Sequence, residues 1–285
     1  MPDANAMIRG RSYLSVVQWP DEWSEDDCIG ALVHAGGGDV FIARQAVRRG
    51  VPGVVHRGDY DEIEAGARGV ADMGAVAFAA HPAKMDGQPS AVQAKQVLPA
   101  GPGRWEIDPW RRRRDDTTKH IIEPGELFLI VRGTTRSTTT RVGSDTGAAA
   151  GDAMLYGTGI AAMNAADGAY GSRSSSTEVS ELLELQTRDG RRYLIDGRKF
   201  NETSLHGDAS LSARDACDLV MRTVAACSPR ALIDRSFNDF RCPPDILKRH
   251  FIGTSAGTVT KTGTGPAFEF YCRWVRLMYL TMLAG

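Results

Sequence analysis

The sequence is poor in cysteine and has none of the usual cysteine motifs. Its five cysteines among 285 residues are odd in number and widely spaced, and no two of them form a CxxC pair. This pattern fits neither a disulfide framework nor a zinc site. We therefore predict no bound metal, and a reducing cytoplasm is the simplest setting for the chain.

The sequence also lacks a charge excess and a long apolar run. Its 34 basic and 35 acidic residues nearly cancel, so no global field attracts nucleic acid or an anionic membrane. The first residues contain no apolar signal core, and the apolar tail, residues 268–283, is interrupted by Glu269, Arg273 and Arg276. We expect a soluble, unexported protein without a membrane or nucleic-acid partner.

The first part of the chain alternates between strand and helix patterns. We predict strands at residues 13–17, 29–34 and 51–56, a helix at 39–49, an acidic turn at 58–66, and a short strand pair at 70–78. The helix should begin at Asp39, since aspartate is a favoured N-cap residue. This pattern indicates a compact α/β domain over residues 1–83.

The composition then changes to proline, glycine, glutamine and alanine. We predict a linker at residues 84–116, with one short helix at 90–97 and a solvated cluster of arginines at 111–114. Beyond it, residues 117–285 read as an α+β domain with antiparallel strands. The expected elements are a strand–turn–strand at 119–131, a hairpin at 181–196, a helix at 212–226 and loops around a site, or a mobile stretch, at 134–177.

Several features of the first domain occur together in one known family. They are a glycine turn after a strand, an Ile-Ala-Arg helix, a Gly-Val-Pro-Gly-Val-Val entry into a strand, and a late Val-Ala-Asp, at residues 36–38, 42–44, 50–55 and 70–72. In these features the stretch resembles the swivelling mobile domain of phosphoenolpyruvate-utilising enzymes. The resemblance implies a swivelling β/β/α fold for this domain.

The phosphate-accepting histidine of that family is absent here. The loop that would carry it reads Gly36, Gly37, Gly38 and then Asp39. Phosphocarrier chemistry is therefore not expected. The glycines and the following helix start still offer backbone N–H groups to an anion, so these four residues are our candidate ligand-binding site for a phosphate or carboxylate.

Short motifs in the second domain resemble those of ADP-ribosyltransferases. They are an Arg-Gly at the end of a strand, a Tyr-Gly-Thr-Gly-Ile run at 156–160, and Phe-Glu-Phe-Tyr at 268–271. The resemblance implies that Arg132 binds NAD, that Tyr170 stacks on its nicotinamide, and that Glu269, on a late strand, assists cleavage of the nicotinamide–ribose bond. NAD is then the implied cofactor. A carboxylate and an aromatic clamp suit an oxocarbenium-like transition state.

Two further sets of residues match parts of known functional motifs. Residues 253–257 match the GxSxG nucleophile elbow, but that elbow needs a following helix, which this sequence does not favour. His120 and Glu126 provide part of a metal-binding pattern, although one histidine supplies too few ligands.

Two functional hypotheses remain open on the sequence. In the first, the protein is an enzyme whose small domain covers a nucleotide-like ligand bound by the second domain. ADP-ribosyl transfer is the most specific version of this hypothesis. In the second, the protein is a non-catalytic binding or scaffold protein that assembles with itself or with a partner.

Overall fold

The computed structural model describes residues 11–36, 38–110, 119–143, 173–201, 205, 211–247, 249–254 and 257–284. The chain has a mixed α/β fold, with a three-stranded antiparallel sheet and a larger mixed sheet. It divides into two compact units. Unit 1 comprises Met1–Thr134, Ser180–Ile246 and Ala267–Gly285, and unit 2 comprises Thr135–Val179 and Leu247–Pro266.

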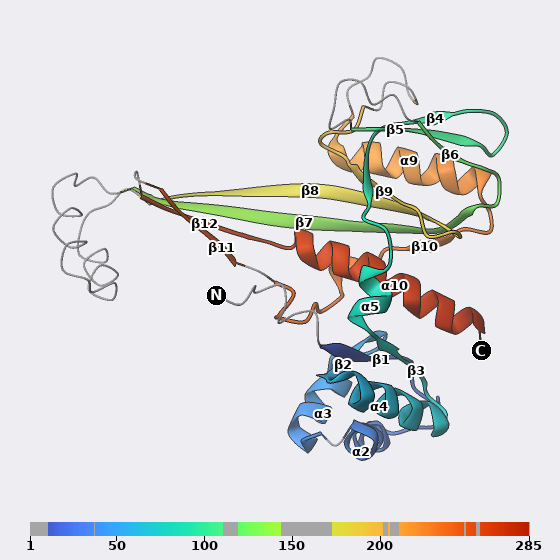
Figure 1. Ribbon diagram of the computed structural model, residues 1–285, viewed down its shortest axis with the longest axis vertical. Helices are drawn as coiled ribbons and strands as arrows, with labels where there is room; N and C mark the ends of the chain where they lie inside the picture. Colours follow the sequence, from blue (N-terminus) through green and yellow to red (C-terminus); the bar gives the residue numbers. More distant parts are fainter. Residues whose placement is uncertain are drawn as a thin grey trace. The chain divides into compact units, whose positions relative to one another are not determined.

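The N-terminal part of unit 1 contains the small sheet. Its strands β1 (Ser12–Gln18), β2 (Gly53–Gly58) and β3 (Val76–Ala80) lie in the order β2-β1-β3, and β1 is antiparallel to both neighbours. Figure 1 shows helices α2 (Glu25–Gly36), α3 (Val40–Arg48) and α4 (Tyr60–Asp72) on one face of this sheet. The predictions of β1, α3 and β2 are confirmed.

Three predictions for this region are wrong. Residues 29–34 belong to helix α2, which starts with a reciprocal capping box: Ser24 N–H donates to Asp27 Oδ2 at 2.9 Å, and Asp27 N–H donates to Ser24 Oγ at 3.2 Å. The predicted acidic turn at 58–66 is mostly the start of α4, whose buried positions have helical spacing. Consequently the predicted strand pair at 70–78 reduces to the single strand β3.

The larger sheet of unit 1 begins inside the predicted linker. Helix α5 (Pro82–Asp86), β4 (Val92–Pro99) and β5 (Trp105–Pro109) occupy most of residues 84–110, while 111–116 lie outside the described residues. The predicted helix at 90–97 is instead part of β4. Alternate apolar residues of these strands, such as Val97 and Ile107, are fully buried, and this burial outweighs the loop-like composition.

The rest of this sheet combines antiparallel pairs, as predicted, with two parallel pairs. Strands β6 (His120–Ile122), β7 (Leu127–Gly143), β8 (Arg173–Thr187) and β9 (Arg192–Asp196) complete the order β7-β8-β9-β4-β5-β6, and β10 (Leu232–Asp234) runs parallel to β7. The predicted hairpin at 181–196 is confirmed as β8–β9. Helix α9 (Ala213–Cys227), predicted at 212–226, is capped by Ser212 and buries Ala216, Val220 and Val224 in the core beneath the sheet.

The C-terminal segment is a helix, α10 (Gly265–Ala284), and residues 268–271 are not a strand. Its side chains share one core with the small sheet: Trp274 Nε1–H donates to Ser15 Oγ at 2.8 Å, and the rings of Trp274 and Phe78 lie 6.0 Å apart. Phe128 and Leu182 of the larger sheet belong to the same core. The N-terminal elements are therefore packed onto the C-terminal helix within unit 1.

Unit 2 is a ribbon of strands. In it, the outer parts of β7 and β8 join β11 (Arg249–Thr254) and β12 (Gly257–Gly263) in the order β11-β12-β7-β8. The stretch predicted as loops, 134–177, thus extends β7 and β8 at its two ends, and its middle, 144–172, lies outside the described residues. A strand rather than a helix follows the GxSxG string, which contradicts a nucleophile elbow.

Among the helices that the structure describes, the longest being the 20-residue α10, none is both long and apolar enough to cross a membrane.

Candidate functional site

At the glycine turn before α3, two of the N–H groups of the helix start are already bonded to a side chain of the chain itself. Asp39 is the N-cap, as predicted, and its Oδ1 accepts hydrogen bonds from the N–H groups of Phe41 at 2.7 Å and Ile42 at 3.4 Å. Gly36 belongs to the last turn of α2, and Gly37 lies outside the described residues. Because the Asp39 carboxylate already serves as the anion at this helix start, a phosphate would have to displace it.

Arg132 is held by two carboxylates of the chain. Its Nη1 pairs with Asp218 of α9, and its Nη2 lies 3.6 Å from Glu181 Oε2 of β8. Glu181 also accepts a hydrogen bond of 3.0 Å from the Thr134 hydroxyl. With 13 % of its side chain exposed, Arg132 ties the sheet to α9 instead of offering a free guanidinium to a cofactor phosphate.

The other two residues of the predicted catalytic set do not join Arg132. Glu269 lies on α10, not on a strand, with 57 % of its side chain exposed, and it pairs with Arg273 Nη2 at 2.9 Å. Tyr170 lies outside the described residues. No described contact connects Arg132 with Glu269. The carboxylate that the ADP-ribosyltransferase resemblance implies therefore lies on a helix instead of a strand, and its described partner is Arg273 instead of Arg132.

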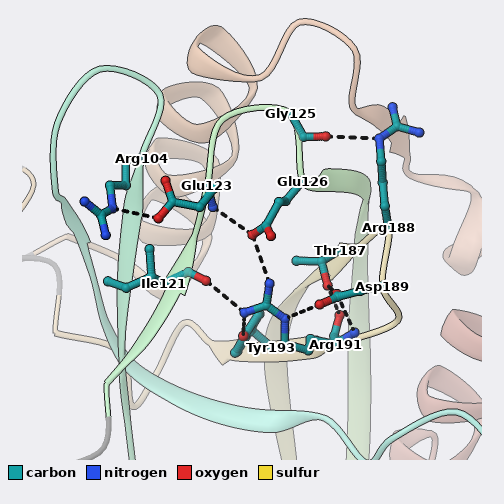
Figure 2. Close-up of polar contacts among 10 residues, drawn as sticks. All are labelled: Arg104, Ile121, Glu123, Gly125, Glu126, Thr187, Arg188, Asp189, Arg191 and Tyr193. Atoms are coloured by element: carbon teal, nitrogen blue, oxygen red, sulfur yellow. Dashed lines mark hydrogen bonds and ion pairs between the residues drawn. The ribbon is translucent and has the colours of Figure 1, made fainter.

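A second polar cluster connects two turns of the larger sheet (Figure 2). Arg191 donates to Glu126 Oε2 at 2.9 Å, to Asp189 Oδ2 at 2.7 Å and to the carbonyl of Ile121 at 2.9 Å. Glu126, proposed above as part of a metal pattern with His120, is thus committed to Arg191. Within the described ranges, no group of histidine, cysteine, aspartate and glutamate side chains could hold a metal ion.

Buried charges in unit 1 are likewise paired inside the fold. Arg192 forms a two-pronged pair with Glu184, through contacts of 2.8 and 2.9 Å, and both side chains are almost fully buried. Desolvation opposes the charge on Arg192, but the Glu184 carboxylate outweighs it and raises the pKa of Arg192. Each of these charges is thus committed to a partner within the fold.

A surface groove in unit 1 is a further candidate, and helix α4 forms one of its walls. Glu64, Ala67, Arg68 and Ala71 line it. Ala67 and Arg68 lie three and four residues after Glu64, and Ala71 lies three and four residues after Arg68 and Ala67, so the four form a single stripe along the helix. Two of the four are alanines, and their short side chains leave space beside the sheet.

The floor of the groove is the edge strand β3, and its other wall is α10. Residues 77–79 of β3 line the floor, Leu277 and Thr281 come from successive turns of α10, and Lys84 of α5 lies at the rim. The groove has a volume of about 330 Å³. This lies near the lower end of the range for small-ligand sites, about 300–1,000 Å³.

The charged side chains at the rim are free of partners in the part of the chain that is described. Arg68 and Lys84 are exposed, and neither they nor Glu64 take part in a described hydrogen bond or ion pair. Two cations face one carboxylate, so the rim has a small positive excess that favours an acidic occupant.

The backbone of β3 offers hydrogen-bonding groups to the groove. β3 pairs with β1 along one side only, and no described backbone segment bonds to its other side. In an antiparallel pair every second residue directs its N–H and C=O away from the partner strand. The open side of β3 therefore presents a short row of donors and acceptors between two helices.

Comparison with known proteins identifies no relative: no protein-family model, no curated protein and no solved structure matches the chain.

Sequence reasoning missed the groove, although one signal was available. The run from Glu64 to Ala71 has the spacing of a helix face with a charged border and small residues in its middle. Interpreting residues 58–66 as a turn concealed that face. The contribution of α10 had no comparable local signal, because it depends on a contact between the chain's two ends.

Proposed function

We propose that this protein is a non-catalytic binding protein that captures an extended segment of a partner by adding it as a strand to the open edge of β3. The observation that carries the proposal is the groove of about 330 Å³ whose floor is an edge strand and whose walls are two helices. Strand addition is a common mode of peptide recognition, in which backbone hydrogen bonds supply much of the affinity.

The dimensions of the strand support this mode. β3 contains five residues, and five residues of extended chain span about 17 Å. The walls from α4 and α10 would shield the new hydrogen bonds from water on both sides of the sheet. Shielding matters because a hydrogen bond between two exposed peptide groups adds little net free energy.

The chemistry of the lining supports binding over catalysis. The polar side chains in the groove are Glu64, Arg68, Lys84 and Thr281, and no histidine or cysteine lines it. No described hydrogen bond joins two of these side chains in the way that a nucleophile is joined to its base in covalent catalysis, and the Thr281 hydroxyl donates to the Leu277 carbonyl. The predicted set Arg132 and Glu269 has its described partners elsewhere.

The test is hydrogen exchange on β3, with and without a labelled alternating threonine–alanine peptide of about eight residues, long enough to cover the strand. Strand addition should slow exchange at alternate amides of Val76–Ala80. Protection at no β3 amide, at any peptide concentration up to solubility, would overturn the proposal.

A matched pair of variants locates the binding. Ala71 lines the groove and Ala65 does not, although both are exposed residues of α4. Ala71→Phe should fill the groove and weaken peptide binding by about tenfold or more, which corresponds to about 1.4 kcal/mol. Ala65→Phe should bind like the parent. Equal binding by both variants would place the peptide elsewhere and contradict the proposal.

A further inference from the structure

We infer that the groove selects a strand with small side chains facing α4 and a carboxylate near the α5 end of β3. This inference rests on the proposed function, because it concerns the segment that β3 would pair with.

The restriction to small side chains comes from the two sides of the sheet at β3. Ala77 and Ala79 pack toward the core under helices α2, α3 and α4, whereas Phe78 packs toward α10. A strand added beside them would alternate in the same way, so every second side chain would face Ala67 and Ala71 of α4. Ala67 is only 6 % exposed and belongs to the core, so α4 cannot shift away from β3 to make space for a bulky residue.

The side facing α10 has a different character. There the lining residues are Phe78, Leu277 and Thr281, which combine an aromatic ring, an aliphatic chain and one hydroxyl. Side chains of medium size, such as threonine or valine, would contact these groups without entering the core. The bound strand should therefore alternate between small side chains, which face α4, and side chains of medium size, which face α10.

The position of the charge follows from chain direction. β2 and β3 are both antiparallel to β1, so they run parallel to each other, and α4, which connects them, runs in the opposite direction. Ala71 therefore lies toward the start of β3 and Glu64 toward its end. Arg68 lies between them, and Lys84 follows β3 on α5.

Arg68 and Lys84 form the basic part of the rim, and Glu64 is the one carboxylate among the lining residues. A carboxylate of the bound strand, placed between Arg68 and Lys84, would meet these two cations and one carboxylate, Glu64, so the net local charge still favours it. A lysine at the same place would be repelled by both cations and attracted by Glu64 alone. Exposed pairs of this kind are weak individually and are screened by salt, so their effect should be a preference among peptides and not the main source of affinity.

The experiment compares four peptides on the full chain by fluorescence anisotropy at low salt: the alternating threonine–alanine peptide, versions with one alanine replaced by aspartate or by lysine toward the Lys84 end, and a version with leucine in place of alanine. The aspartate peptide should bind several-fold tighter than the lysine peptide, and the leucine peptide should lose measurable binding. Arg68→Glu should reverse the order of the two charged peptides, whereas Arg44→Glu, at an exposed position of α3 outside the groove, should preserve it.

The possible failures are distinguishable. If the neutral peptide protects β3 while the aspartate, lysine and leucine peptides bind equally well, the selectivity is wrong and strand addition stands. If no peptide changes exchange at β3, both the selectivity and the proposed function are wrong. If Arg68→Glu leaves the order unchanged while the leucine peptide fails to bind, the assignment of the carboxylate site is overturned.

Discussion

Gly197 follows β9 at a place where the backbone of α9 comes unusually close. A Cβ atom added there would collide with the carbonyl oxygen of Ala213 and would lie 3.0 Å from the sulfur of Cys217. The Gly197 N–H also donates to the Glu181 carbonyl at 2.9 Å, which holds the residue in place. The absence of a side chain at this one position is thus what allows α9 to pack against the sheet.

We expect Gly197→Ala to destabilise the protein by about 1–3 kcal/mol, since overpacking forces the helix or the strand to shift. Gly30 provides the control. It lies in helix α2, and an added Cβ would meet nothing within 4 Å. Gly30→Ala should stabilise the protein by about 0.5–1 kcal/mol, because alanine is the better helix former. Urea denaturation measures both, and a neutral Gly197→Ala would contradict the close packing.

The turn between β8 and β9 shows how a local hydrogen-bond network tightens one hairpin. Asp189 accepts hydrogen bonds from the Thr187 hydroxyl and, at 2.7 Å, from Arg191 Nε. The hydrogen bond from Thr187 is the main cause of a lowered pKa at Asp189, and Arg191 adds to it against a small cost of desolvation. The ionised form of Asp189 is therefore the form that supports the turn.

Because folding lowers the pKa of Asp189, the hairpin should lose stability when this carboxylate is protonated. A carboxylate whose pKa is lowered by folding contributes stability above its unfolded value, here 3.8, and loses it as the pH falls through the lowered pKa. Asp189→Asn should reduce the urea midpoint at neutral pH, and its difference from the parent should shrink as the pH is taken below 3.8. A difference that stays constant across this range would show that the charge of Asp189 does not support the hairpin.

The role of helix α4 depends on the elements that lie beside it. As an isolated helix, α4 carries a stripe of small and charged residues that resembles an ordinary solvated face. Next to the open edge of β3 and to α10, the same stripe becomes one wall of a binding groove. Exposure of an edge strand is a liability that proteins normally cover, so a partly walled edge is consistent with a surface reserved for a partner.

Across the whole of unit 1, α10 is the element that joins the two sheets. Trp274 is fully buried between them, bonded to Ser15 and packed 4.9 Å from the ring of Phe240. A swivelling domain needs an interface that can dissociate. The interface between the small sheet and α10 is instead part of a continuous apolar core. The packing of α10 thus favours one cooperative unit over a mobile N-terminal domain.

We expect Trp274→Ala to destabilise unit 1 by about 3–5 kcal/mol. Amides of β1 and of β8 within unit 1 should lose protection together when hydrogen exchange is followed. Trp110→Ala, at a position that is 46 % exposed, is the control and should change stability little. Loss of protection in β1 alone, with β8 unchanged, would indicate an independent N-terminal body and support the swivelling arrangement instead.

Local patterns in the sequence predicted several elements correctly. The alternation of β1, the Asp39 cap, helix α9 and the β8–β9 hairpin depend on neighbours a few residues away, so their physical causes are present in a short stretch of chain. The errors arose where two local signals competed. At residues 29–34 an apolar run resembled a strand, while the capping box at Ser24 and Asp27 started a helix.

Composition by itself determined that the chain has no cysteine framework and no charge excess, and local patterns predicted β1, β2, the β8–β9 hairpin and helices α3 and α9. The tertiary structure alone decided the partners of Arg132, the helical state of residues 268–271 and the groove beside β3. The reason is that these features depend on contacts between segments far apart in the chain. Leu277 and Ala71, for example, line one groove because both ends of the chain pack on the same small sheet.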